Sequence, residues 1–545
     1  MVISKNRMLS WAAGFTFAAL YLALLTQQYI GDGLRWYGAI AGLRPIELGG
    51  TNHLLYPLVG HAWFLAWTSL GLPASYALAQ SMNAVLGGVA LGFFCAIVQA
   101  WTGRVWLALA ATITLGLSRA FSLHGVDMTE PMPGVACVMA GIWLASRHAL
   151  RPGRRGWLIL AGGLIGLGGA IYQANIIAVI GACALVGLAG PARGQRARWF
   201  DTALIGLAAG STAAAVYLTA FMTLGGAQTL GEAFKASLQT VNERYGSVYA
   251  EISLRRLGVL VFGLADSLFG IRGVEGLGTN LFARGLTREV IIALVATGCA
   301  ALVPAAVSLL YARLPRVKPG ERRAGEGRVL LALVAWLVPQ LGLAFYFGAR
   351  YSKLWVLALA VILLIVAVLL EALERKATQF RGSWRVGAAL FMGVWVVPVS
   401  VVGLAANMIP DHNTPQACGV DAQKIAALLG PRDLLVSDWG GLACAPEAPF
   451  PTLSLVETAV EARLNPKLTA DRLAGAISAV QSAGGSVYFH VLLDMSAPEW
   501  EPFFGQRLRL PRTVLDPYRS RATIALPLAA VTIEGGQMNL WKLAP

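Results

Sequence analysis

Runs of about 20 predominantly apolar residues recur along most of this chain, and they limit its fold more than any other feature. One of them, LWVLALAVILLIVAVLLEAL at 354–373, contains Glu371 as its single charged residue. A helix that crosses a bilayer needs about 20 such residues. Of all 545 residues, 57% are apolar and 13% are charged, whereas about 25% are charged in soluble domains. The sequence therefore predicts a polytopic α-helical membrane protein.

Positive charge is gathered in short clusters between the apolar runs. The formal net charge is +15, and the main clusters are RHALRPGRRG (147–156), ARGQRAR (192–198) and RLPRVKPGERRAGEGR (313–328). Cytoplasmic loops of membrane proteins carry an excess of Lys and Arg. This explains the charge without a nucleic-acid partner, and none is expected.

The same charge pattern predicts a topology of about eleven spans. Met8–Gln28 follows a short basic start and is predicted to be a retained first span with its N-terminus in the cytoplasm. The run at 157–190 is divided into two spans that turn at 172–175. The other predicted spans are 77–99, 105–121, 133–147, 203–223, 289–313, 329–347, 354–373 and 386–408. This puts the C-terminus outside the cytoplasm, and the alanine-, glycine- and arginine-rich composition favours a bacterial inner membrane.

The apolar segment His53–Leu72 is predicted to lie along the outer face instead of crossing the membrane. It contains His53, Pro57 and His61, and Pro73 follows it. Counting it as a full span would move the cluster at 147–156 to the outside, against the charge rule. It is therefore expected to be a juxtamembrane or re-entrant helix.

The composition changes after the last apolar run, so a membrane domain at 1–409 and a second domain at 410–545 are predicted. Helical patterns (DAQKIAALLG, TADRLAGAISAVQSAG) alternate there with strand-like runs (DLLVSD, GSVYFHVLL, AAVTIEGG). This indicates a small extracytoplasmic α/β domain. Cys418 and Cys444 lie in it. A disulfide between them would close a loop of roughly 25 residues and stabilise the fold by about 3 kcal/mol, and the alternative of two free thiols stays open.

The predicted topology brings acidic and basic side chains to one face of the membrane. The stretch Tyr29–Pro57 forms the first outward loop and is rich in glycine, aromatic residues and charge. The candidates on the outer face are Asp32, Arg35, His53, His61, His124, Asp127, Glu130, Lys235, Arg244, Arg255, Arg256, Arg350, Tyr351 and Lys353. Acids come from the first two loops, and bases come mostly from later ones.

That combination suits transfer of a group from a polyprenyl-phosphate carrier. A carboxylate at the membrane surface can deprotonate or orient an acceptor hydroxyl. Cations at headgroup depth can hold a lipid-linked phosphate and stabilise the charge that grows as it leaves. We expect Arg35, His53, His124, Lys235, Arg244, Arg350 and Tyr351 to contact the substrates.

Four short motifs resemble the GT-C superfamily of membrane glycosyltransferases, in particular its protein-mannosyltransferase-like branch. They are GDGLRWYGAI (31–40), NHLLYP (52–57), HGVDMTEP (124–131) and GARYSKLW (348–355). The resemblance implies an inverting enzyme that uses a polyprenyl-phosphate-linked sugar. It implies that Asp32 is the first-loop catalytic acid, acting as general base or orienting the acceptor. It also implies that Asp127 or Glu130 is the second-loop acid that assists or helps to bind a divalent cation, and that Arg350 contacts the donor phosphate.

Each of these residues also has a simpler explanation. Asp32 is well placed to cap a helix that begins near Gly33. Asp127 and Glu130 precede Pro131, and acids are favoured at the start of a helix. Arg350 can extend to lipid headgroups. His53 can simply pack, and Lys235 and Arg244 can be surface charges.

Other functions and ligands remain open at this level. A transporter or flippase of a lipid-linked substrate is the main alternative, and charges buried at mid-membrane would favour it. A scaffold that presents the outer domain is a third. The sequence has no HExxH or CxxC metal motif, so no cofactor is certain and a divalent cation is left open. The sugar and the acceptor are not indicated.

Overall fold

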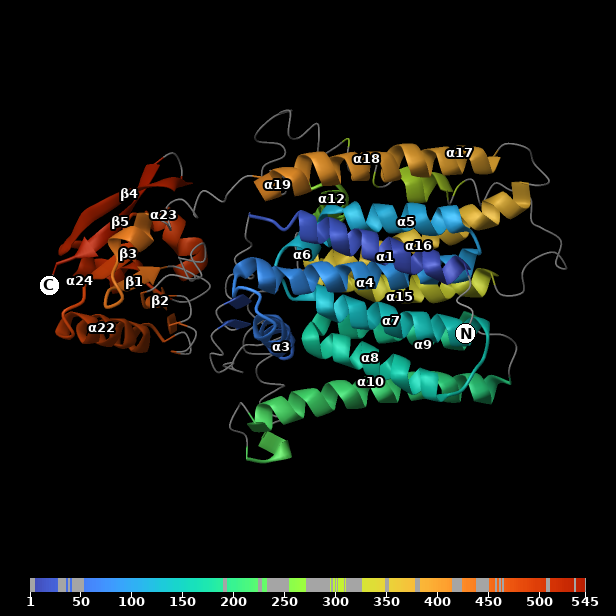
Figure 1. Ribbon diagram of the computed structural model, residues 1–545, viewed down its shortest axis with the longest axis horizontal. Coiled ribbons are helices and arrows are strands. Elements are labelled where there is room, and N and C mark those ends of the chain that lie inside the picture. The colour runs from blue at the N-terminus through green and yellow to red at the C-terminus, as the bar shows by residue number, and fades with distance from the viewer. Residues whose placement is uncertain are drawn as a thin grey trace. The chain divides into compact units, whose positions relative to one another are not determined.

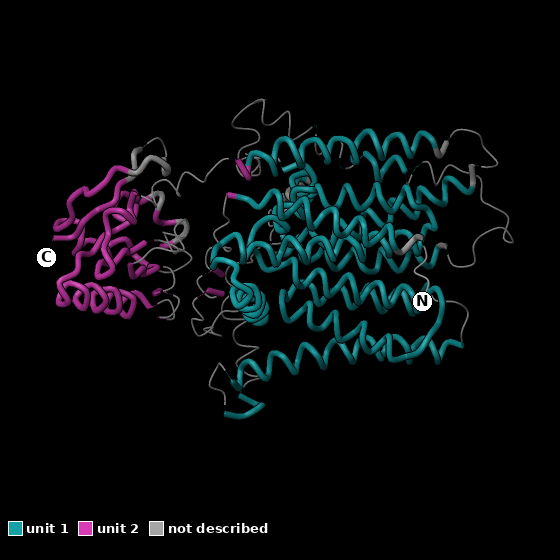
Figure 2. Tube along the Cα trace, in the orientation of Figure 1, with its two compact units in different colours: residues 1–26, 45–410 teal, residues 27–44, 411–545 magenta. Residues whose placement is uncertain are grey.

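The computed structural model shows a helical protein with one small sheet. It describes residues 5–27, 36–37, 40–41, 53–189, 194–223, 228–232, 254–270, 295, 298, 300, 302–307, 309, 326–347, 352–377, 383–413, 424–437, 450–455, 458–459, 462, 465–505, 510–533 and 536–544. The chain divides into two compact units, one of residues 1–26 and 45–410 and the other of residues 27–44 and 411–545 (Figure 2). The sequence-based division into domains at 1–409 and 410–545 stays a prediction.

Long helices that run side by side build the first unit (Figure 1). In chain order they are α1 (Lys5–Ala23), α3 (Tyr56–Ser69), α4 (Tyr76–Thr102), α5 (Val105–Leu117), α6 (Arg119–Val126), α7 (Pro131–Leu150), α8 (Gly156–Ile171), η1 (Gln173–Ile177), α9 (Ala178–Ala184), η2 (Leu185–Ala189), α10 (Gln195–Thr223), α12 (Leu254–Phe269), α15 (Glu326–Phe347), α16 (Ser352–Ala377), α17 (Ser383–Leu390), η4 (Phe391–Val396), α18 (Val397–Val401), η5 (Val402–Met408) and α19 (Ile409–Asn413).

Five stretches of helix in the described residues are long and apolar enough to cross a membrane: Tyr76–Thr102, Gln195–Thr223, Gly327–Tyr346, Ser352–Arg375 and Arg385–Asn413. A sixth is added if α5 and α6, which meet at a bend of 64°, form one broken span. Shorter apolar helices occupy Met8–Ala23, Gly156–Ile171 and Gln173–Ala189. The helical membrane architecture is confirmed, and the count of about eleven spans stays a prediction.

The predicted division of the run at 157–190 is present in the structure. Helix α8 ends at Ile171, and Tyr172 has an extended backbone before η1 begins. Helix α3 has 14 residues, which is too short for an ordinary span, so its predicted position along the membrane face remains open.

Helix α16 lies at the centre of the first unit. Of its most apolar window, 89% is buried inside the protein, as expected for a helix that is apolar all round. Its first turn contains Ser352 and Lys353. The start of this central helix therefore brings a cation close to residues from much earlier in the chain.

Small residues allow α8 and α10 to pack with their backbones close together. A Cβ atom added at Gly162 would collide with the carbonyl oxygen of Ile205, and one at Gly166 would collide with that of Ala209. The spacing is the G-x-x-x-G pattern of closely packed membrane helices.

We expect Gly166→Ala to lower the free energy of unfolding by about 1–3 kcal/mol, because the new methyl group cannot fit without separating the two helices. Gly163→Ala is the matched control, since a Cβ there would have only Thr212 Oγ1 nearby, at 3.7 Å. Thermal unfolding of both variants in detergent tests this. Equal stabilities would show that α8 and α10 are not packed as described.

A five-stranded mixed sheet forms the core of the second unit. Its strands are β1 (Leu434–Ser437), β2 (Thr452–Ser454), β3 (Val487–His490), β4 (Ala522–Ile533) and β5 (Gly536–Leu543), in the order β2-β1-β3-β5-β4. Strands β2, β1 and β3 are parallel, and β5 pairs antiparallel with β3 and β4. Strands β1 and β3 lie in runs predicted to be strand-like, and β4 overlaps the third such run at 529–533. Helix α22 (Pro466–Ser482) covers all but the last two residues of the predicted helical pattern at 469–484.

Alternation along the strands separates the two faces of this sheet. Val436 and Phe489 pack in one apolar cluster with Leu473 of α22, while Leu435 and Tyr488 pack in a second cluster on the other face. Successive side chains of a strand point to opposite faces, so both faces of β1 and β3 are covered. Cys418 and Cys444, with their predicted disulfide, lie outside the described residues.

Candidate functional site

The second predicted outer loop is a short, ordered turn between α6 and α7. Pro131 begins α7 with its fixed backbone angle at the first helical position. The side-chain amide of Asn83 in α4 donates to the carbonyl oxygens of His124 (3.2 Å), Asp127 (2.8 Å) and Thr129 (2.6 Å). One fully buried amide therefore fixes the path of the whole turn.

Asp127 is fully buried, and its carboxylate oxygen Oδ1 accepts three hydrogen bonds. The donors are the Tyr76 hydroxyl at 2.9 Å, the Gln80 amide at 3.3 Å and the backbone N–H of Met128 at 2.7 Å. Tyr76 and Gln80 belong to α4. These bonds satisfy the buried charge, and they attach the turn to α4.

Glu130 is also buried, but its partners are charged or chargeable groups from distant segments. Its Oε1 lies 3.3 Å from Nε2 of His53 and 3.5 Å from Nζ of Lys353. The Glu130 side chain is 2% exposed, whereas those of His53 and Lys353 are 14% and 21% exposed. The buried carboxylate is therefore reached from outside through a histidine and a lysine, and we call these three residues the Glu130 cluster.

Two tyrosines complete the surroundings of the Glu130 cluster. The Tyr172 ring stacks on His53 with the ring centres 5.2 Å apart, and Lys353 Nζ lies 5.9 Å from the same ring. Burial raises the pKa of the Tyr56 phenol well above its usual value, and the nearby carboxylates of Glu130 and Asp127 raise it further. Tyr56 is therefore protonated at physiological pH.

His124 connects the turn to the start of α16. Its Nδ1 is 2.8 Å from the Thr129 hydroxyl, and its Nε2 is 3.0 Å from the Ser352 hydroxyl. The ring is 4% exposed. These contacts hold Ser352, and with it Lys353, beside the Glu130 turn.

The structure brings four of the predicted site residues together: Asp127, Glu130, His53 and His124. The predicted site residues Asp32, Arg35, Lys235, Arg244, Arg350 and Tyr351 lie outside the described residues. The residues that sequence reasoning left out of the site are Lys353, Tyr172, Tyr76, Gln80 and Asn83. The sequence predicts Lys353 on the outer face but gives it no part in substrate binding, and Tyr172 lies at the predicted turn at 172–175. Polar residues at the N-terminal end of the apolar run 77–99 are the signal that would have pointed to Gln80 and Asn83.

The described residues contain no group of three His, Cys, Asp or Glu side chains arranged to hold a metal ion. Around Glu130 the neighbours are one histidine and one lysine. A divalent cation at Asp127 or Glu130 stays a prediction.

Similar proteins were found by structure alone. No protein-family model matches the chain, and no curated protein matches it. The oligosaccharyltransferase of Archaeoglobus fulgidus in its apo form matches 93% of this chain and 72% of its own, with 14% identity and a TM-score of 0.52. ArnT from Cupriavidus metallidurans bound to undecaprenyl phosphate matches 98% of this chain and 97% of its own, with 15% identity and a TM-score of 0.49. The match to the S. cerevisiae protein O-mannosyltransferase Pmt1-Pmt2 complex bound to the sugar donor covers 41% of this chain and only 35% of the mannosyltransferase chain, with 14% identity and a TM-score of 0.34.

The likeness to the oligosaccharyltransferase establishes the class of fold. The chain is a helical, multi-pass membrane protein that also carries a small sheet. This oligosaccharyltransferase is a member of the GT-C superfamily, so the likeness confirms the fold predicted from the four short motifs.

Proposed function

We propose that this protein is an inverting membrane glycosyltransferase that moves a sugar from a polyprenyl-phosphate donor to an acceptor on the extracytoplasmic face. The observation that carries the proposal is the Glu130 cluster: a buried carboxylate, a histidine and a lysine, contributed by three distant segments of a GT-C fold. The lipid-linked donor follows from the resemblance of the four short motifs to the GT-C superfamily.

The chemistry requires a base, a phosphate site and shelter from water. The acceptor loses a proton and attacks the anomeric carbon of the sugar, and the carbon–oxygen bond to the phosphate breaks. Polyprenyl phosphate then leaves with the bonding electrons. Asp32, the first-loop acid, is proposed as the base, and Lys353 with Arg350 would stabilise the charge on the departing phosphate.

Within this scheme Asp127 and Glu130 have different tasks. The hydrogen bonds to Asp127 make it a positioning residue that attaches the turn to α4. Glu130 stands between a histidine and a lysine that are partly exposed, so it can orient both and contact the acceptor or donor. The proposed setting is the inner membrane, with about eleven spans, a cytoplasmic N-terminus and an extracytoplasmic C-terminal α/β domain.

The test is transfer activity of the purified full-length protein. Incubation with radiolabelled polyprenyl-phosphate sugars should release free polyprenyl phosphate, while the labelled sugar passes to the acceptor or, where water replaces the acceptor, becomes water-soluble free sugar. Reconstituted vesicles distinguish the alternative of a transporter or flippase, which would move the labelled lipid between leaflets with its sugar–phosphate bond intact. Movement without cleavage, across a panel of donor sugars, would overturn the proposal.

Lys353→Gln is expected to raise the KM for the donor roughly tenfold, because one charge-assisted contact to the phosphate is lost. Lys353→Arg keeps the positive charge and should restore most of the donor affinity. Steady-state kinetics over a range of donor concentrations separates KM from kcat. If both variants behave like the original protein, Lys353 does not bind the donor.

A further inference from the structure

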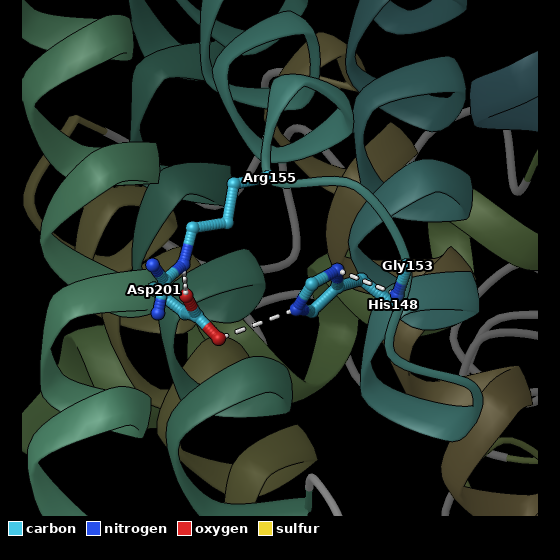
Figure 3. A network of polar contacts seen from close by, with 4 residues as sticks. All are labelled: His148, Gly153, Arg155 and Asp201. Carbon is cyan, nitrogen blue, oxygen red and sulfur yellow. Dashed lines mark hydrogen bonds and ion pairs between the residues drawn. The ribbon is translucent and has the colours of Figure 1, made fainter.

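Two arginine-rich segments, far apart in the sequence, lie together at one end of the helices of the first unit. One is the turn between α7 and α8, and the other is the beginning of α10. Asp201 of α10 joins them: its Oδ1 is 2.9 Å from Nε of Arg155, and its Oδ2 is 3.3 Å from Nε2 of His148 (Figure 3). Because Asp201 is only 2% exposed, the turn is held by a buried carboxylate.

Further contacts hold the turn in this position. The Gly153 backbone N–H donates to Nδ1 of His148 at 3.5 Å, as Figure 3 shows. The guanidinium of Arg155 lies 4.7 Å from the centre of the Phe200 ring, within the range of a cation–π contact. The arginines of the turn and those of α10 therefore form one continuous surface, residues 147–157 with 195–200, which we call the arginine surface.

The arginine surface has a large excess of positive charge. Its exposed arginines are Arg147, Arg151, Arg154, Arg155 and Arg196. Asp201 is the one acid next to these segments in the sequence, and both of its oxygens are already occupied. In the described part of the chain no acidic side chain forms an ion pair with Arg147, Arg151, Arg154 or Arg196.

Exposed apolar side chains continue directly from the arginine surface along α8 and α10. Trp157 and Trp199 are 50% and 67% exposed, and Ile159, Phe200 and Leu207 are also more than half exposed. Tryptophan gathers at the boundary between headgroups and acyl chains. Along these two helices arginine is followed by tryptophan and then by aliphatic residues. This order matches the headgroups, the boundary region and the acyl chains of one leaflet.

We propose that the arginine surface is a binding site for an anionic phospholipid. The phosphate of the headgroup lies among the exposed arginines, and the acyl chains lie along the apolar side chains of α8 and α10. Basic pockets between membrane helices are suited to such headgroups. Asp201 positions Arg155 within the site, and it offsets only one of the positive charges.

The experiment uses the full-length protein in lipid nanodiscs, with lipid binding measured by native mass spectrometry in competition between phosphatidylglycerol and phosphatidylcholine. The triple variant Arg151→Gln, Arg154→Gln, Arg196→Gln should lower the preference for phosphatidylglycerol by about 100-fold, since each arginine near a membrane surface contributes about fivefold. These side chains are exposed, so folding should be retained. Arg104→Gln is the matched control, because Arg104 is paired with Glu374 at 3.3 Å.

Three results would overturn the proposal. The triple variant could keep the full lipid preference, or Arg104→Gln could reduce it equally, which would indicate general attraction by the net charge. Soluble glycerol phosphate could also displace the lipid at equal concentration. That result would mean that the arginines bind a free anion and that the apolar side chains add nothing to the binding affinity. The expected result is that glycerol phosphate competes weakly.

Discussion

Glu130→Gln is expected to lower sugar transfer by about 100-fold, the order expected when groups at a reacting centre are misplaced by about 1 Å. Glutamine has nearly the same shape, so the change removes the negative charge while keeping the packing. His53 and Lys353 would then face a neutral amide in place of the carboxylate that holds them at 3.3 and 3.5 Å. Because Lys353 and His53 are partly exposed, water can solvate them, and the variant should remain folded.

The measurement is single-turnover transfer from a labelled polyprenyl-phosphate sugar, with thermal unfolding recorded beside it. Glu374→Gln is the matched control, because Glu374 lies on the same helix as Lys353 and also pairs with a cation, Arg104. Its transfer rate should be unchanged. A folded Glu130→Gln protein with full activity would remove Glu130 from the chemistry.

Asp32→Asn is expected to lower transfer by about 100- to 10,000-fold, the range typical of losing a positioned acid–base group, because an amide cannot accept the proton of the acceptor. This substitution also separates catalysis from helix capping. Asparagine caps a helix about as well as aspartate, whereas alanine does not. If Asp32 only caps a helix, Asp32→Asn should be active and stable, and Asp32→Ala should lose about 1 kcal/mol of stability.

If Asp32 is the base, both variants lose activity and Asp32→Asn keeps its stability. Glu47→Gln is a suitable control, since Glu47 is another acid of the same loop with no proposed task. Transfer kinetics and thermal unfolding of the three variants settle the matter. Inactivity of Glu47→Gln as well would mean that the loop, and not the Asp32 carboxylate, is what activity requires.

Much of the second unit could be predicted because its strands are short apolar runs and its helices are longer mixed patterns. The short apolar runs in DLLVSD and GSVYFHVLL are typical of strands buried on both faces, and β1 and β3 confirm them. Strands β2 and β5 were not predicted. The first has only three residues, and the second, GQMNLWKL, mixes polar and apolar residues without a clear apolar run.

Within the candidate site, residue type and order along the chain did not separate Asp127 from Glu130. Both are acids in one turn, and both are buried. Asp127 binds a hydroxyl, an amide and a backbone N–H, while Glu130 meets a histidine and a lysine. The difference follows from which side of the turn faces α4 and which faces the start of α16, and this depends on tertiary packing.

By itself the sequence determined that the chain is a membrane protein of many helices, since long apolar runs cannot remain in water and basic clusters mark the loops between them. It also determined the helix–strand alternation near the C-terminus. Only the tertiary structure decided that His53 and Lys353 meet Glu130, and that Asp201 of α10 contacts the arginine-rich turn between α7 and α8. A helix that is apolar on every side, as α16 is, carries no periodic signal for its rotation or its neighbours, so those contacts come from packing alone.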